Sequence, residues 1–150
     1  MKKRHAVQNY LPDAYRLMRE IDSLIKTGIN PYYFELIKIR ASQLNGCAYC
    51  INAHINDAMK LGEDLQRLNL LSAWREAENW FNEDEQTIIR LTEEITLIGE
   101  HGISDEVYEK AIELFGEEKL SYLIMAAISI NSWNRLGVGL RLHPVKYAAK

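Results

Sequence analysis

The chain has 150 residues, a formal net charge of −3, and 47% hydrophobic and 26% charged residues. This length suits one domain with a buried core, and the composition is that of an ordinary globular protein. The acidic balance excludes the basic footprint of proteins that bind nucleic acid or anionic membrane surfaces. No apolar stretch follows the basic residues 1–4, and the most apolar run, Leu120 to Ile130, is too short to span a bilayer. We therefore expect a cytoplasmic protein with neither a nucleic-acid nor a membrane partner.

Apolar residues keep helical spacing along nearly the whole chain, and no alternating run of β-branched residues suggests a strand. This pattern predicts an all-α fold of seven helices in a single domain over residues 1–150, with ends marked by caps, glycines and prolines. In chain order the predicted helices span about residues 13–26, 31–44, 47–62, 65–74, 83–98, 105–116 and 118–136.

Local signals fix several of these helix ends. Asn30 followed by Pro31 is typical of an N-cap and a first-turn proline. Asn82 with Glu85 three residues later forms a capping-box pattern. In the first helix we expect one apolar stripe to face the core, made of Tyr15, Met18, Ile21, Leu24 and Ile25.

The two cysteines, Cys47 and Cys50, are only three positions apart. A secreted domain stapled by disulfides would spread its cysteines along the chain, so this pair points to redox chemistry or metal binding. Together with His54 the cysteines occupy positions i, i+3 and i+7 of the third predicted helix and share one face. Gly46 puts them in the first turn, where free backbone N–H groups and the helix dipole favour a thiolate.

His54 decides which cysteine we assign as the nucleophile. At a rise of 1.5 Å per residue it lies about 6 Å along the axis from Cys50 but about 10.5 Å from Cys47. Helical side chains lean toward the N-terminus, so the imidazole tilts toward Cys50 and can accept its proton. Cys47 lies nearer the helix end, but the dipole contributes only about 0.3–1 kcal/mol, and we give the base more weight. Cys50 is therefore the predicted nucleophile.

Glu35, in an apolar stretch of the preceding helix, is the candidate to orient His54. From its position alone a surface residue paired with Lys38 is the more common interpretation. Glu35, Cys47, Cys50 and His54 nevertheless match, without a gap, the signature of the alkylhydroperoxidase D (AhpD) family in the carboxymuconolactone decarboxylase superfamily. Other segments that resemble the family bring the likeness to about two-thirds of the chain; they are residues 58–62, 73–76, 83–85 and 131–136.

The resemblance implies an all-helical AhpD-like domain, with its core signature at about residues 31–62, that assembles as a homo-oligomer, a trimer or a hexamer. It also implies a thiol-dependent peroxidase that reduces organic hydroperoxides or hydrogen peroxide. In this cycle Cys50 is the peroxidatic cysteine, Cys47 the resolving cysteine, His54 the proton acceptor and Glu35 the relay. Tyr49 replaces a second histidine found in some members, so we expect no relay there, only a hydrogen bond to substrate.

No cofactor is expected beyond the redox-active Cys47–Cys50 disulfide and an external dithiol reductant, lipoyl-like or thioredoxin-like. A peroxiredoxin is a further potential partner. The sequence leaves several alternatives open. The cysteines could be buried small hydrophobes, or they could bind zinc together with His54 and Glu35, although structural zinc sites usually draw two ligand pairs from separate elements. The protein could also be a lactone decarboxylase, which needs no paired cysteines, or a non-enzymatic redox sensor.

The last predicted helix carries two amides, Asn131 and Asn134, in an apolar setting. They are interpreted as satisfied core amides or as interface residues. Trp133 and Arg135 belong to types enriched at interfaces, yet a tryptophan at helical spacing is more often part of the core. We expect all four residues to serve packing or subunit contact rather than catalysis.

Overall fold

The structure is a computed structural model that describes residues 2, 4–99 and 101–147. Regular structure within these residues is entirely helical, which confirms the predicted all-α single domain. The elements are η1 (Val7–Asn9), α1 (Pro12–Lys26), α2 (Pro31–Leu44), α3 (Ala48–Lys60), α4 (Leu65–Leu70), η2 (Leu71–Glu76), η3 (Glu78–Trp80), α5 (Glu83–Thr96) and α6 (Asp105–Gly139), where η denotes a 3-10 helix. Among the described residues, no helix combines the length and apolar character needed to cross a lipid bilayer.

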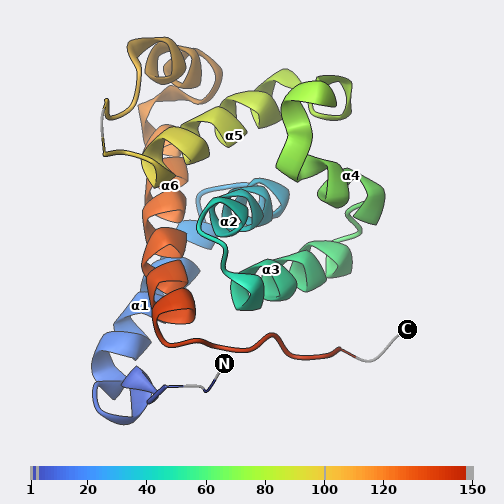
Figure 1. Cartoon of the computed structure of the whole chain (residues 1–150). Coiled ribbons are helices and arrows are strands. Elements are labelled where there is room, and N and C mark those ends of the chain that lie inside the picture. Colours follow the sequence, from blue (N-terminus) through green and yellow to red (C-terminus); the bar gives the residue numbers. More distant parts are fainter. Residues whose placement is uncertain (1, 3, 100, 148–150) are drawn as a thin grey trace.

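Helix α2 occupies the centre of the molecule and packs against α3, α5 and α6 (Figure 1). All residues from Phe34 to Ser42 are buried, including the charged ones, because the helix is covered on every side. Its start follows the predicted pattern: the Asn30 side chain accepts a hydrogen bond from the Tyr32 N–H at 2.9 Å, and Pro31 occupies the first turn. A charged group on this helix must therefore find its partner inside the protein.

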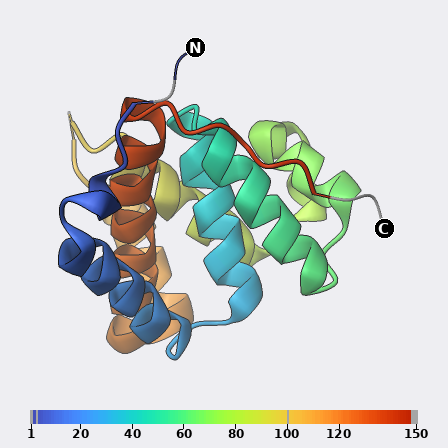
Figure 2. The same ribbon diagram turned by 90° about the horizontal axis from the view of Figure 1, so that it is seen from below.

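The predicted sixth and seventh helices are the two arms of α6, which bends at Gly116. Gly116 has a φ of 70°, a left-handed conformation that glycine adopts without steric cost. The second arm buries Leu120, Leu123, Ala126 and Ile130 against the core, as its apolar sequence predicts. This arm runs alongside α1 and also packs against α2 and α3 (Figure 2).

Several predicted boundaries and one predicted face differ from the structure, among them the third helix, which ends at Lys60, and the last, which ends at Gly139. The fourth helix ends at Leu70 and continues as η2, because Ala73 leaves the helical region with a φ of −123°. The fifth ends at Thr96 rather than at residue 98. In α1, Ile21 and Leu24 are exposed, because the helix instead turns Asp22 and Ile25 inward.

The two terminal segments lie at the same end of the molecule as the start of α3 (Figures 1 and 2). The N–H of Arg4 donates to the carbonyl of Leu140 at 3.1 Å, and its guanidinium donates to the carbonyl of Gly139 at 2.8 Å. The C-terminal segment then extends along α3, where the Asn52 amide donates to the carbonyl of Val145 at 2.8 Å. These contacts enclose the space next to the two cysteines.

Candidate active site

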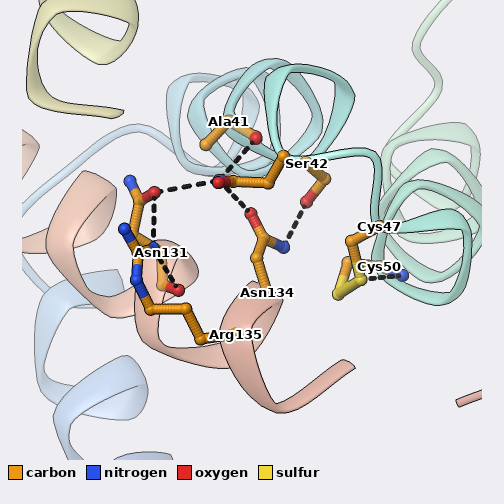
Figure 3. The surroundings of a disulfide bond; sticks show 8 residues. Ala41, Ser42, Cys47, Cys50, Asn131, Asn134 and Arg135 are labelled. Carbon is orange, nitrogen blue, oxygen red and sulfur yellow. Dashed lines mark hydrogen bonds between the residues drawn. A yellow bond between two sulfur atoms is a disulfide. The ribbon is translucent and has the colours of Figure 1, made fainter. Parts of the chain in front are cut away.

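Cys47 and Cys50 form a disulfide, with their Cα atoms 5.3 Å apart (Figure 3). Cys47 is the N-cap of α3 rather than its first helical residue, and its sulfur accepts a hydrogen bond from the Cys50 N–H at 3.3 Å. Gly46, with a φ of 65°, lets the chain leave α2 and enter α3 at once. The cysteines thus lie at the N-terminal end of α3, as the sequence predicts.

The side chains of Glu35 and His54 meet between α2 and α3. The Glu35 Oε2 lies 2.7 Å from the His54 Nδ1, and the Glu35 residue is only 4% exposed. The interpretation of Glu35 as a surface residue is therefore wrong. Lys38, its suggested partner, is fully buried and pairs instead with Asp22, the Nζ to Oδ1 distance being 2.5 Å.

The two cysteines line different cavities. Cys50 and His54 line a cavity of about 500 Å³, which we call the His54 cavity. Cys47 lines a smaller one of about 230 Å³, the Cys47 cavity, between the start of α3, the end of α6 and residues 141–144. Tyr49 and Leu142 border both. Because the cysteines are only 2% and 5% exposed, these cavities are the routes by which small molecules can approach them.

The model of the carboxymuconolactone decarboxylase family matches residues 12–93, a range that contains Glu35, both cysteines and His54. The chain belongs to this family. It is 38% identical over 141 residues to YdfG, an uncharacterised protein of Bacillus subtilis strain 168, covering 93% of this chain and 95% of that one. It also resembles the crystal structure of ATU0492 from Agrobacterium tumefaciens, a protein of unknown function provisionally ascribed to AhpD antioxidant defence. There the TM-score is 0.91 at 32% identity, over 97% of this chain and 100% of that one. The likeness to AhpD is confirmed at the level of the family.

In this carboxymuconolactone decarboxylase family member, α1 and α6 supply a polar wall of the His54 cavity. The Asp22 carboxylate accepts hydrogen bonds from the Trp133 indole at 2.8 Å and from the Ser129 hydroxyl at 2.5 Å. Burial would raise the pKa of Asp22, but Lys38 and these hydrogen bonds outweigh it and hold the pKa below its ordinary value. Asp22 was not predicted as a site residue, although a carboxylate between Ile21 and the apolar end of α1 is a signal in the sequence that points to it.

Beside the disulfide, hydrogen bonds of side-chain amides connect α2 and its C-cap residue to α6 (Figure 3). The Asn45 amide donates to the side-chain oxygens of Asn131 and Asn134, both at 2.9 Å, and Asn134 donates to the Ser42 hydroxyl at 2.9 Å. The interpretation of Asn131 and Asn134 as satisfied core amides is confirmed. Trp133, expected only in packing or subunit contact, lines the His54 cavity.

Helix α6 approaches the disulfide closely at Gly137. A Cβ placed on Gly137 would lie 2.7 Å from the Cys47 Sγ and 3.2 Å from the Cys50 Sγ. Only glycine leaves room for both sulfurs at this point. The sequence alone does not predict a need for glycine at position 137, because this need comes from the packing of two helices that are distant in sequence.

One group of side chains among the described residues has the arrangement of potential metal ligands: Glu35, His54 and Asp57, whose ligand atoms lie within 4.8 Å of one another. The zinc alternative required the two cysteines as ligands. In this structure they are joined to each other and offer no thiolate.

Proposed function

We propose that the protein is a thiol-dependent peroxidase that reduces organic hydroperoxides or hydrogen peroxide through a cysteine disulfide cycle. One observation carries the proposal: Cys50, one half of a disulfide at a helix N-terminus, lines the same cavity as His54, whose Nδ1 is hydrogen-bonded to the buried Glu35 carboxylate. A dithiol nucleophile, a base and a group that orients the base are the components this reaction needs.

In the reduced protein, His54 accepts the thiol proton of Cys50, directly or through a water. The Cys50 thiolate then attacks the terminal oxygen of the hydroperoxide, and the O–O bond breaks. The alkoxide that leaves takes the proton back from His54 and departs as the alcohol, while Cys50 becomes a sulfenic acid.

Cys47 resolves the sulfenic acid. Its sulfur attacks the Cys50 sulfur, the S–S bond forms, and the hydroxide leaves with the Cys47 proton as water. An external dithiol, lipoyl-like or thioredoxin-like, then supplies two electrons and two protons and is itself oxidised to a disulfide. Because Cys47 lines its own cavity, the reductant has a route to this sulfur that does not cross the His54 cavity.

Tyr49 stands between the two cavities and is 38% exposed, so we assign it a hydrogen bond to substrate rather than a proton-transfer role.

We also propose a cytoplasmic location, where dithiol reductants keep thiols reduced, and assembly as a homo-oligomer, a trimer or a hexamer. Exposed apolar side chains on α1, at Leu17, Ile21 and Leu24, support association with a second copy. Light scattering on the purified protein measures the oligomer size.

The test separates the two cysteines. With a dithiol reductant, the purified protein should consume cumene hydroperoxide continuously, and Cys50→Ser should abolish this. Cys47→Ser, first reduced and then freed of the reductant, should consume one equivalent in a single turnover and stop at the sulfenic acid. If Cys50→Ser retains that single turnover and Cys47→Ser loses it, the two roles are reversed. No turnover with any of several reductants would contradict the proposal.

A lactone decarboxylase is the second candidate, because the matching family model bears the name of that activity. Such an enzyme does not need the disulfide cycle. Activity on a carboxymuconolactone that survives in the Cys47→Ser/Cys50→Ser double variant would favour this candidate over the peroxidase.

A further inference from the structure

We propose that the hydroperoxide reduced at this site carries a carboxylate, which Arg19 and Lys26 bind at the α1 side of the His54 cavity. The inference rests on the proposed peroxidase function and adds a substrate class to it: amphipathic organic acids that bear a hydroperoxide group. Hydrogen peroxide and neutral alkyl hydroperoxides have no carboxylate, so they would not contact Arg19 and Lys26 in this way.

One face of α1 lines the cavity opposite the cysteine. Its residues Tyr15, Arg19, Asp22 and Lys26 are spaced i, i+4, i+7 and i+11, so they share a side of the helix. Cys50 and His54 come from α3, and α1 and α3 lie on either side of α2 and α6 (Figure 2). The cationic groups and the reactive sulfur therefore belong to different walls of one cavity.

The acidic groups that line this cavity, and the Glu35 carboxylate behind His54, are already partnered. The pairs are Asp22 with Lys38 at 2.5 Å, Asp57 with Lys60 at 2.7 Å, and Glu35 with His54 at 2.7 Å. None of these carboxylates is left to neutralise an additional cation on α1.

Arg19 and Lys26 have no such partner within the part of the chain that the structure describes. Their contacts are with aromatic rings: the Arg19 guanidinium carbon lies 5.3 Å from the Tyr15 ring centre, and the Lys26 Nζ lies 4.8 Å from the Phe34 ring centre. Both side chains are exposed at the cavity wall. These two cations have no carboxylate partner, share one face of α1 and line the same cavity. They therefore favour the binding of an anion at the α1 side of the His54 cavity.

The remaining walls suit an apolar body. Helix α6 contributes three large side chains and the C-terminal segment two more: Ile130, Trp133, Leu136, Leu140 and Leu142. The cavity of about 500 Å³ falls within the range of about 300–1,000 Å³ typical of small-molecule sites. It combines cations on one wall, a thiol and a base on another, and apolar surface around them. A hydroperoxide with an apolar chain and a terminal carboxylate matches this arrangement.

The experiment compares linoleic acid hydroperoxide with its methyl ester, both below their micellar concentrations, and uses cumene hydroperoxide as the neutral reference. The rate constant for oxidation of the reduced protein is measured in single turnovers by stopped-flow fluorescence, because Trp133 lines the cavity. We expect the acid to react about tenfold faster than the ester, the order expected from two solvent-exposed charge contacts.

In the Arg19→Gln/Lys26→Gln double variant the ratio of acid to ester should fall to about one. Arg16→Gln is the matched control, because Arg16 lies on α1 outside the cavity and already pairs with Glu20. This control should keep the ratio of the unmodified protein, and added salt should lower that ratio.

The outcomes distinguish the inference from the function on which it rests. Equal rates for acid and ester, or a ratio that survives in the double variant, would overturn the carboxylate site while the peroxidase stands. If no peroxide oxidises the protein, the proposed peroxidase function is refuted. The carboxylate site is then tested separately, by comparing the binding of dodecanoate and of dodecanol to the oxidised protein. Dodecanoate binding that exceeds dodecanol binding and is lost in the double variant would support the site, and equal binding would overturn it.

Discussion

The His54 Nδ1 and the Glu35 Oε2 are 2.7 Å apart and join α3 to the most buried stretch of α2. A carboxylate can only accept in this contact, so Nδ1 carries the proton. In the neutral imidazole, Nε2 is then left as the acceptor, and it is the nitrogen available to a thiol or a water in the cavity. The contact thus sets the tautomer that a general base at this position requires.

Replacing Glu35 with Gln should slow the oxidation of Cys50 by peroxide by about 10²-fold, at the lower end of what general-base catalysis contributes. The glutamine amide can donate to Nδ1, which shifts the proton to Nε2 and removes the acceptor from the cavity. The measurement is the second-order rate constant for oxidation of the fully reduced protein by cumene hydroperoxide.

Glu94→Gln is the matched control, because the Glu94 carboxylate bonds Ser104 at the start of α6 and does not line the His54 cavity. It should leave the oxidation rate unchanged. A Glu35→Gln rate equal to that of the control would show that His54 works without its carboxylate.

Much of the fold could be predicted because its signals are local. The predicted capping box at Asn82 is present in full: the Asn82 side chain accepts from the Glu85 N–H, and the Glu85 carboxylate accepts from the Asn82 N–H, both at 2.9 Å. Capping depends on residues three positions apart, so a single stretch of sequence specifies it. The spacing of the cysteines and His54 along α3 likewise depends only on residues close together in the sequence.

What the sequence could not predict depends on contacts between distant residues. The inward turn of Asp22 is set by Lys38 and by Trp133, which lies 111 residues further along the chain. The apolar pattern of α1 favoured Ile21 and Leu24 as core residues, but the buried ion pair decided the face. Likewise, only the packing of α6 on the disulfide shows that Gly137 must be small.

Protein stability should fall in acid through Glu93, a buried carboxylate that accepts hydrogen bonds from Arg40, Arg75 and the Trp74 indole. Burial would raise the pKa of Glu93, but these donors outweigh it and hold the pKa below its ordinary value. Because the pKa of Glu93 is lower in the folded protein than in the unfolded chain, where it is about 4.3, ionised Glu93 stabilises the fold. This contribution to the free energy of unfolding is fully present above the unfolded-state pKa and is lost as the pH falls through the folded-state pKa. Urea unfolding between pH 7 and pH 3 measures this loss.

Glu93→Gln should reduce that pH dependence and lower the free energy of unfolding at pH 7 by about 3 kcal/mol, because two arginines lose their counter-ion. Glu76→Gln, at an exposed position, is the control and should change neither quantity. The same acid dependence in Glu93→Gln as in the unmodified protein would assign the acid sensitivity to other carboxylates.

Asn134 should contribute to stability through its contacts with Asn45 and Ser42. It is 1% exposed, so Asn134→Ala would take from the buried Ser42 hydroxyl the hydrogen bond that it accepts, while the Asn45 amide would keep the Ala41 carbonyl and the Asn131 side chain as acceptors. We expect a loss of about 2 kcal/mol in the free energy of unfolding, measured in urea on the oxidised protein. Asn69→Ala, on the exposed side of α4, is the control, and an equal effect of both substitutions would argue against a role for the amide cluster.

Two glycines of α6 provide a matched test of how closely this helix packs on the disulfide. A Cβ on Gly137 would meet the Cys47 sulfur at 2.7 Å, whereas a Cβ on Gly139 would meet nothing within 4 Å. Gly137→Ala should therefore destabilise the oxidised protein by about 1–3 kcal/mol, the usual cost of overpacking. Gly139→Ala should be neutral or slightly stabilising, since alanine restricts the unfolded chain more than glycine does. Both substitutions make the same chemical change two residues apart, so the difference in their free energies of unfolding isolates the contact with sulfur. If Gly137→Ala proved as stable as Gly139→Ala, α6 would have to move away from the disulfide at little cost, and its close approach would not constrain the site.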